Sequence, residues 1–356
     1  MRAAILWTGM SGYLNACLKE LAGREAVELF VSRQAPVQEA PFDNTQFSWI
    51  QNSLVWRSLP DYVSLEARLR AFDPEVLVFS GWHLPAYRRI AKEFAKRCMR
   101  VMVMDNPWEA TPKQRLGALI APWYIRPLAD KVWVPGERQA VFARKFGFGE
   151  RDIFWGMLSC DQPAFEAMHL SRLAAGRKVP RSFLFVGMLA SHKGVDQLVD
   201  AYECYRQKSI DPWPMVCCGT GSLGTRLEGR LGIRVEGFVQ PDILRHRLAE
   251  AGCLILPSRV DHWAIVVHEA AAAGLLILAS DKVGAAVHLV QNNYNGYIID
   301  SEDVRDLAER MAHVSNLSEA RLDAMSRASN LLSKQYSPAR WADTLLDGFQ
   351  TWSATE

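Results

Sequence analysis

The sequence predicts an α/β protein of two domains, each built around a doubly wound parallel sheet. Short apolar runs alternate with helical patterns along most of the chain, which is typical of βαβ units and hence of parallel strands. The alternation lapses once, near the middle of the chain. At 356 residues, of which 49% are hydrophobic, the chain is long enough for two domains that each have a core.

The N-terminal domain is expected over residues 1–160. Its strands are predicted at the apolar runs 3–7, 27–31, 76–79, 101–104 and 132–134. A first helix is predicted over 13–21, entered through the loop Thr8-Gly-Met-Ser-Gly12. Backbone N–H groups in such a glycine loop can bind an anion, so Gly12 is a candidate ligand-binding residue, although the G-x-G-x-x-G spacing is absent.

Residues 161–181 are expected to form a linker, because periodicity lapses there and Pro163, Gly176 and Pro180 interrupt the chain. A second domain is expected over 182–335. Its strands are predicted at the apolar runs 183–187, 215–218, 233–236, 253–256, 275–279 and 297–299. Ser337-Pro338 favours the start of a last helix within 336–356, which we expect to pack on the N-terminal domain.

Composition excludes several classes of protein. Lys and Arg total 41 against 39 Asp and Glu, a net charge of +2, so no nucleic acid partner is expected. The seven cysteines show no C-x-x-C spacing, which favours reduced thiols over a metal cluster. The chain has no uncharged apolar run of about 18 residues, and its N-terminal run is too short for a signal peptide. A cytoplasmic protein without a membrane span is therefore expected.

Glycine-bearing and charged loops follow successive strands of the second domain. The carboxyl ends of parallel strands lie at one edge of a sheet, so these loops are expected to meet there. Lys193 brings an ammonium group to that edge, and Asp261 and Glu269 bring carboxylates. An ammonium suits a phosphate and a carboxylate accepts from hydroxyls, which predicts a phosphorylated, hydroxyl-rich ligand. The alternative is an ordinary set of strand-to-helix crossovers with solvated charges.

Five motifs follow one another in order across residues 183–310. They are Phe185-Val186-Gly187 with Lys193-Gly194-Val195-Asp196; Gly219-Thr220-Gly221; Gly237-Phe238-Val239; Pro257-Ser258 with Glu269-Ala270, Ala272 and Gly274; and Ser280 with Gly284 and Asn295-Gly296. This order resembles the donor domain of the family 4 retaining glycosyltransferases of the GT-B fold. The resemblance implies two Rossmann-like domains that face each other across a cleft.

The resemblance also implies roles for individual side chains. Glu269 occupies the position of the carboxylate that binds the ribose hydroxyls, and Lys193 that of a cation on the leaving diphosphate. Asp261 stands where the family has a Glu beside the transferred sugar, one methylene shorter. The donor site is expected to comprise Gly12, Gly187, Lys193, Gly219, Gly221, Phe238, Val239, Asp261, His262, Trp263, Ala264 and Glu269.

The chain departs from the family pattern near the sugar diphosphate. Met188 replaces an Arg five residues before Lys193, and Trp263-Ala264 replaces Phe-Gly, a bulkier turn near the sugar. We expect His192, Arg259 or the first-domain loop to replace the lost cation, or the transferase to be weak or inactive. No D-x-D motif occurs, so neither a metal nor a cofactor is expected beyond a donor such as a UDP- or GDP-sugar.

The first half offers weaker signals about the acceptor. His83, after the apolar run 76–79, is a candidate for the catalytic-side histidine of the family, because Asp105-Asn106 stand where that histidine is expected. Residues 87–100 are predicted to form one basic amphipathic helix that docks on anionic lipid, with aromatics of the segment 122–127 at the interface. The alternative is a solvated helix face over the sheet. Docking implies a lipid-linked acceptor; otherwise a soluble acceptor stays open.

Together these observations predict retaining, metal-independent transfer of a hexosyl group from a nucleotide-sugar to a glycan or lipid-linked acceptor. Surface polysaccharide, lipopolysaccharide or glycolipid assembly is the expected setting, in the cytoplasm or peripherally on the inner face of the membrane. Two alternatives stay open. One is a nucleotide-sugar epimerase of related fold, and the other is a non-catalytic protein that binds a glycan or a partner glycosyltransferase, for which Met188 is the main evidence.

Overall fold

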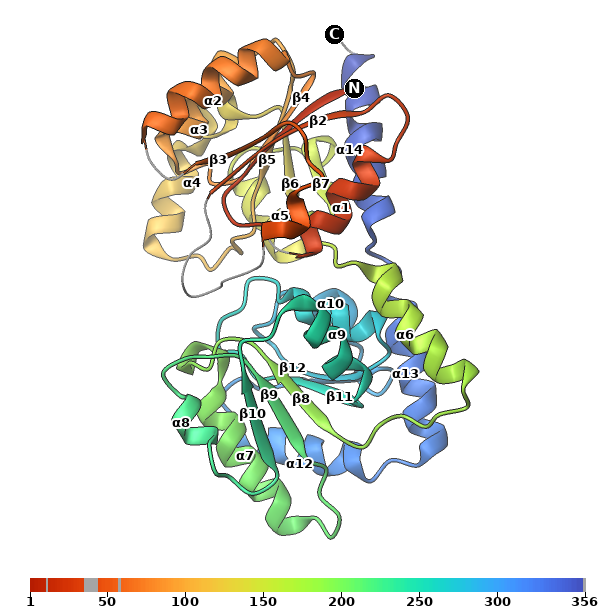
Figure 1. The fold of residues 1–356 in the computed structure, drawn as a ribbon. Coiled ribbons are helices and arrows are strands. Elements are labelled where there is room, and N and C mark those ends of the chain that lie inside the picture. Colours follow the sequence, from red (N-terminus) through yellow and green to blue (C-terminus); the bar gives the residue numbers. More distant parts are fainter. Residues whose placement is uncertain (11, 35–43, 57–58, 355–356) are drawn as a thin grey trace. The chain divides into compact units, whose positions relative to one another are not determined.

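The computed structural model describes residues 1–10, 12–34, 44–56 and 59–354 (Figure 1). The chain divides into two compact units. Unit 1 comprises Met1–Cys160 and Pro338–Glu356, and unit 2 comprises Asp161–Ser337. Each unit contains one sheet in which every strand pairing is parallel, so the predicted fold class is confirmed.

Within the described residues, the sheet of unit 1 has seven strands in the order β3-β2-β1-β4-β5-β6-β7. They are β1 (Arg2–Trp7), β2 (Glu28–Gln34), β3 (Ser53–Trp56), β4 (Val76–Phe79), β5 (Met99–Val103), β6 (Lys131–Val134) and β7 (Ile153–Trp155). The helices are α1 (Gly12–Ala22), α2 (Leu59–Phe72), α3 (Pro85–Glu93), α4 (Pro112–Tyr124), α5 (Glu137–Lys145) and α14 (Pro338–Ser353), with short 3₁₀ turns at Asn44–Phe47, Arg126–Leu128 and Glu150–Asp152. Strands β3 and β7 lie at the sheet edges, and neither has a continuously buried apolar run.

Alternate residues of the central strands belong to two separate cores. Ala4 and Leu6 of β1 pack in one core, whereas Ala3 and Ile5 pack in the other. Side chains alternate between the faces of a strand, so both faces of the sheet are covered. This double burial explains why the strands appear in the sequence as unbroken apolar runs.

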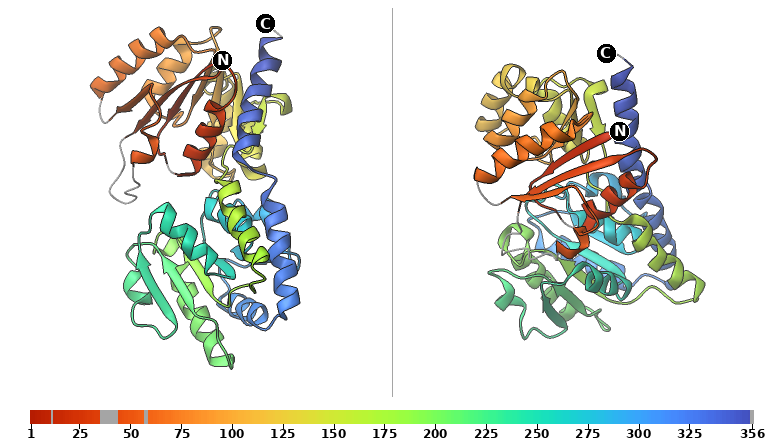
Figure 2. Two further views of the ribbon diagram at one scale, coloured as in Figure 1. Left: turned by 45° about the vertical axis from the view of Figure 1, so that its right-hand side comes forward. Right: turned by 45° about the horizontal axis from the view of Figure 1, so that its top comes forward.

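Helix α14 follows unit 2 in the chain but packs in unit 1, where it lies beside α1 (Figures 1 and 2). Its Trp341 is buried and stacks on Trp133 of β6, with ring centroids 4.6 Å apart. The indole N–H of Trp341 donates a 2.9 Å hydrogen bond to the carbonyl of Met157. The second core of unit 1 therefore includes residues from both ends of the described chain.

The sheet of unit 2 has six strands in the order β10-β9-β8-β11-β12-β13. They are β8 (Phe183–Val186), β9 (Met215–Cys218), β10 (Ile233–Gly237), β11 (Cys253–Leu256), β12 (Leu276–Ser280) and β13 (Gly296–Ile299). The helices are α6 (Gln162–Ala174), α7 (Val195–Lys208), α8 (Gly224–Leu227), α9 (Pro241–Ala249), α10 (Ile265–Ala272), α11 (Ala286–Leu289), α12 (Val304–Ser315) and α13 (Glu319–Ser333). The order reverses between β8 and β11, and ligands of open α/β sheets bind outside the carboxyl ends of strands at such a switch point.

The segment expected to be a linker, 161–181, instead contains helix α6. Pro163 lies in the first turn of α6, where a helix tolerates proline, and Gly176 follows its C-terminus. Buried Phe165 and His169 hold α6 in unit 2, where it packs on α10. Two of the three residues that suggested a break, Pro163 and Gly176, therefore mark the two ends of a helix.

The predicted basic helix over 87–100 is wrong in its second half. Helix α3 ends at Glu93, Lys96 adopts a positive φ of 62°, and Arg100 lies in β5. The Arg100 side chain is buried and donates to both carboxylate oxygens of Asp130. Cations that were expected on one solvated face thus lie on different elements.

In the part of the chain that the structure describes, no helix combines the length and the apolar character that a membrane crossing needs. All seven cysteines are free thiols, and six of them are buried.

Candidate functional site

Two loops meet at the switch point of unit 2. One follows β8 and includes the 3₁₀ turn Ser191–Lys193, and the other follows β11 and leads into α10. The backbone N–H groups of Arg259 and Val260 both donate to the carbonyl of His192, over 2.9 and 3.1 Å. The two loops therefore form one backbone-linked platform at the carboxyl ends of β8 and β11.

Gly194 makes this close approach possible. Its φ is +70°, and a Cβ atom added there would lie 2.0 Å from the carbonyl oxygen of Pro257. Only glycine satisfies both the left-handed backbone and the missing space.

Lys193 and Asp261 form an ion pair on this platform. The Nζ atom of Lys193 donates to Oδ2 of Asp261 over 2.7 Å, and both side chains are mostly buried. An ammonium carries three N–H donors, so binding to Asp261 leaves donors for a further anion. The structure thus brings together two of the residues that the sequence singled out.

Glu269 lies in the second turn of α10 and is half-buried. No described residue donates a hydrogen bond to its carboxylate. Shielding from water raises the pKa of Glu269 to about 7, and the charge of Arg245 on α9 acts in the opposite direction. A shielded carboxylate that lacks donors from the described protein is suited to accept hydrogen bonds from ligand hydroxyls.

The loops after β8, β9 and β10 pack backbone against backbone. A Cβ atom on Gly219 would lie 1.8 Å from the Gly187 carbonyl oxygen, and one on Gly221 would lie 2.5 Å from that of Leu189. The N–H of Gly219 donates to the carbonyl of Gly237 over 2.6 Å, and half-buried Phe238 and Val239 follow directly. The predicted glycine motifs therefore lie along one sheet edge.

The loop after β12 supports residues 261–263 from the other side. The N–H of Gly284 donates to the Asp261 carbonyl, and the N–H of Ala285 donates to the Trp263 carbonyl. A Cβ atom on Gly284 would lie 1.9 Å from the carbonyl oxygen of His262. This backbone contact fixes the entry to α10, whose first N–H groups have no intrahelical acceptor and can bind an anion.

Trp263 was expected to enlarge the turn near the sugar, but its side chain is buried in an aromatic cluster. Its ring lies 5.4 Å from Tyr336 and 5.9 Å from His288, between centroids. The ring therefore packs in the core of unit 2, and only the backbone of Trp263 lies along the loop. Ala264, where the family has Gly, adopts a positive φ of 66°.

Arg259 was one candidate to replace the cation lost at Met188. Its guanidinium forms a two-pronged pair with the carboxylate of Asp196, over 2.7 and 2.8 Å, and also donates to the carbonyl of Ser191. The hydrogen-bonded guanidinium of Arg259 lowers the pKa of Asp196. Arg259 therefore braces the turn that carries Lys193. Met188 and His192 are both exposed on the same loop.

The remaining two candidate residues belong to unit 1. His83 is exposed after β4, with its ring edge-on to Trp82, and Gly12 is the first residue of α1, after β1. Strands β1 and β4 are neighbours at the switch point of that sheet. Ser11, beside Gly12, lies outside the described residues. Arg245 and the Arg259–Asp196 pair were not predicted, because no motif spacing marks them.

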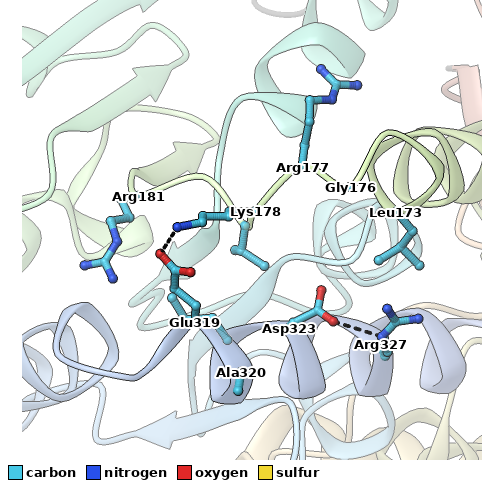
Figure 3. A pocket seen from close by; sticks show the side chains of 11 residues that line it. Leu173, Gly176, Arg177, Lys178, Arg181, Glu319, Ala320, Asp323 and Arg327 are labelled. Carbon is cyan, nitrogen blue, oxygen red and sulfur yellow. Dashed lines mark hydrogen bonds and ion pairs between the residues drawn. The ribbon is translucent and has the colours of Figure 1, made fainter.

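A hollow of about 440 Å³ lies elsewhere in unit 2, beside the amino end of β8 (Figure 3). Four of its charged side chains form two ion pairs, Lys178 with Glu319 over 2.5 Å and Arg327 with Asp323 over 3.0 Å. The loops that carry Lys193 and Asp261 follow the opposite ends of the strands, so this hollow is separate from the platform.

Comparisons with known proteins agree with the motif pattern. Residues 175–330 match the family model described as glycosyl transferases group 1. An uncharacterized glycosyltransferase of Methanocaldococcus jannaschii is 30% identical over 123 residues, which cover 33% of this chain and 31% of that protein. The alpha-D-kanosaminyltransferase of Streptomyces kanamyceticus is 23% identical over 169 residues, which cover 46% and 43%. The matches thus span less than half the length of these curated relatives.

Solved structures resemble the whole chain. HepE of Anabaena in complex with UDP and glucose superposes with a TM-score of 0.72 at 15% identity, covering 98% of this chain and 99% of that one. Sucrose-phosphate synthase of Thermosynechococcus elongatus superposes with a TM-score of 0.68 at 12% identity, covering 99% and 100%. These likenesses show the GT-B fold, and with the family match they confirm the resemblance predicted from the motifs.

Proposed function

We propose that this protein transfers a hexose from a nucleotide-diphosphate-sugar to an acceptor hydroxyl, with retention of configuration and without a metal. One observation carries the proposal: the Lys193–Asp261 pair lies at the switch point of unit 2, inside the segment that matches group 1 glycosyl transferases. A nucleotide-sugar presents phosphates and hydroxyls together. The platform offers an ammonium and carboxylates for these two kinds of group.

In this proposal Glu269 accepts hydrogen bonds from the ribose hydroxyls. A vicinal diol offers two O–H donors to one ionised carboxylate. The raised pKa of Glu269 and its lack of donors from the described residues both support this role, because a ligand would supply what the protein does not.

Lys193 and the first N–H groups of α10 stabilise the diphosphate as it leaves. Such preorganised donors act without reorganising during the reaction, so no metal is required. The bond from the anomeric carbon to the phosphate oxygen breaks, and the bond to the acceptor oxygen forms on the same face. The acceptor proton passes to the departing phosphate oxygen, which leaves no role for a protein nucleophile.

The acceptor is proposed to be a glycan or a lipid-linked sugar, within the assembly of a surface polysaccharide, lipopolysaccharide or glycolipid. A UDP-hexose is the first donor to test, because HepE of Anabaena was solved with UDP and glucose. A lipid-linked acceptor would require the protein to work peripherally at a membrane, on its cytoplasmic face.

The deciding experiment incubates the purified chain with UDP- and GDP-hexoses, with and without glycan and lipid-linked acceptors, in EDTA. We expect a glycoside product only with acceptor. Epimerised donor without acceptor would identify an epimerase instead, and a strict need for a divalent ion would overturn the metal-free mechanism. Lys193→Ala should lower kcat/KM at least tenfold, about 1.4 kcal/mol, whereas exposed Lys208→Ala should leave it unchanged.

A second candidate function follows from Met188. The family Arg is absent there, and the Arg259 guanidinium is bound to Asp196 and Ser191. Lys193, which pairs with Asp261, is then the cation that we expect to contact the diphosphate. A protein that binds the nucleotide-sugar without transfer fits this reduced charge. Tight donor binding with no turnover across the acceptor panel would favour it.

A further inference from the structure

Helix α4 of unit 1, whose course Figure 1 shows, carries an apolar stripe that is exposed to solvent. Leu116, Leu119, Ile120 and Trp123 are exposed by 65, 69, 51 and 80%. Their spacing of i, i+3, i+4 and i+7 places them on one face of the helix, which we name the α4 stripe. A surface helix of a globular protein normally turns such a stripe inward, so this face is available to a partner.

The opposite face of α4 holds it on unit 1 with small and polar side chains. Ala121 is buried, Gly117 and Ala118 are half-buried, and the Gln114 side chain donates to the carbonyl of Pro107. The Thr111 hydroxyl caps the helix by accepting from the N–H of Gln114. The outward orientation of the stripe is therefore fixed by contacts on the other face.

Cations surround the stripe. Lys113 and Arg115 are exposed on α4, which contains no acidic residue. From α3, the guanidinium of Arg88 lies 4.0 Å from the ring centroid of Tyr124, and Lys92 lies one turn further along. We name Arg88, Lys92, Lys113 and Arg115 the basic rim.

A hollow of about 360 Å³ opens between α3 and Tyr124, lined by Pro85, Arg88, Arg89, Lys92 and Tyr124. Arg89 pairs with Glu66, whereas no carboxylate of the described residues lies within 4 Å of Arg88 or Lys92. The hollow therefore presents positive charge that no described carboxylate neutralises, beside the stripe, where an anionic group can bind.

We propose that the α4 stripe and the basic rim dock the protein peripherally on a lipid surface that carries anionic headgroups. The stripe inserts at the interface, where Trp and Tyr rings are favoured, and the rim contacts the headgroup phosphates. Charge selects this occupant over a second copy of the chain, because two copies would bring their basic rims together. The surface shares Trp123 and Tyr124 with the segment 122–127 that was expected at the interface. It differs from the helix predicted at 87–100, since α4 supplies the apolar face and α3 supplies only part of the charge.

Vesicle flotation with the full chain tests the proposal. We expect binding to phosphatidylcholine vesicles that contain phosphatidylglycerol, weak binding to phosphatidylcholine alone, and loss of binding as salt rises. The measurement needs neither donor nor acceptor, so its outcome is independent of the proposed transferase activity.

Matched pairs of variants distinguish lipid binding by the α4 stripe and basic rim from non-specific adsorption to vesicles. Leu119→Ser with Trp123→Ser should weaken vesicle binding at least tenfold, whereas Ile210→Ser with Leu231→Ser, at exposed apolar sites of unit 2, should not. Arg88→Glu with Lys92→Glu should also weaken it at least tenfold, and Arg177→Glu with Arg181→Glu should not. Unchanged thermal melting confirms that each variant is folded.

Three outcomes would overturn the proposal. The chain could stay unbound on anionic vesicles, or the control pairs could lose as much binding as the stripe and rim pairs. Alternatively, sedimentation could show a dimer that Leu119→Ser with Trp123→Ser dissociates, without lipid binding, which would assign the stripe to a second copy.

Discussion

The folded protein disfavours the ionised form of the Glu269 carboxyl group. Its pKa is raised from 4.5 to about 7 by shielding from water. Between these values the folded state binds more protons than the unfolded state, so this group lowers the free energy of unfolding as pH rises from about 4.5 to 7. A carboxyl group whose pKa is shifted at such a cost in stability is expected to bind a ligand.

Donor affinity should therefore depend on pH. The ionised form of Glu269 accepts from hydroxyls, so affinity for a UDP-hexose should rise as pH rises through about 7 and then level off. A nucleotide-sugar is the right probe, because its diphosphate does not titrate in this range. Calorimetric titration across this pH range should show the rise in the native chain and a weak, flat profile in Glu269→Gln. A native profile in Glu269→Gln would remove Glu269 from the site, and exposed Glu228→Gln serves as control.

Ala264 shows strain where the family has Gly. A left-handed conformation costs a non-glycine residue about 1–2 kcal/mol, while the freer unfolded chain of a glycine variant offsets part of this. Ala264→Gly should therefore raise the free energy of unfolding by about 0.5–1 kcal/mol, measured by urea denaturation. Ala271→Gly, in the helical backbone of α10, should lower it. Destabilisation by both variants would contradict the strain at Ala264.

Most of the strands could be predicted from the sequence. The apolar runs predicted five strands of unit 1 and all six described strands of unit 2. Most of these strands are covered on both faces and are therefore apolar on both, whereas β10 is an edge strand that is only partly buried. Strands β3 and β7, at the edges of the unit 1 sheet, were missed because each is both short and only partly buried. Pro163 and Gly176 suggested a linker because the same residues mark loops and helix boundaries, and only the burial of Phe165 and His169 distinguishes the two.

Within the platform, the motifs predicted Lys193, Asp261 and the glycines, whereas the contacts that brace them came only from the structure. Arg259 was one of three candidates to replace the cation missing at Met188, but its pairing with Asp196 depends on how α7 and the loop after β11 pack together. No spacing along the chain encodes that packing. Likewise, Trp263 was assigned to the donor site from its position in the motif alone. The direction of its ring depends on packing against Tyr336, which lies far along the chain.

Arg259→Lys tests this brace at the level of the element. A lysine cannot reproduce the two-pronged contact with Asp196, so the turn that carries Lys193 should loosen. We expect kcat/KM to fall by about three- to tenfold with a smaller loss of stability, roughly 1 kcal/mol. Arg226→Lys, which removes a guanidinium from the exposed pair with Asp200, is the matched control. Equal activity in the two variants would show that the brace is dispensable.

At the level of the whole molecule, the two units should respond separately to core substitutions. Trp341→Ala removes a buried ring that stacks on Trp133, at a cost of about 3–5 kcal/mol. Hydrogen exchange should then speed up in β6 but not in β8. Trp213→Ala, which removes a buried ring beside Phe183 in unit 2, should produce the reverse pattern. Uniform loss of protection in either variant would mean that the units unfold as one.

The path of the chain also affects how the protein is made. Unit 2 occupies a continuous stretch, whereas unit 1 is interrupted between residues 160 and 338. During translation the seven described strands of unit 1 leave the ribosome first, yet Trp133 and α1 stay uncovered until α14 is synthesised and packs on them. Unit 2 is fully synthesised before α14 emerges, so the unit that starts second can finish folding first. Until then, the nascent first unit exposes an apolar face that a chaperone can recognise.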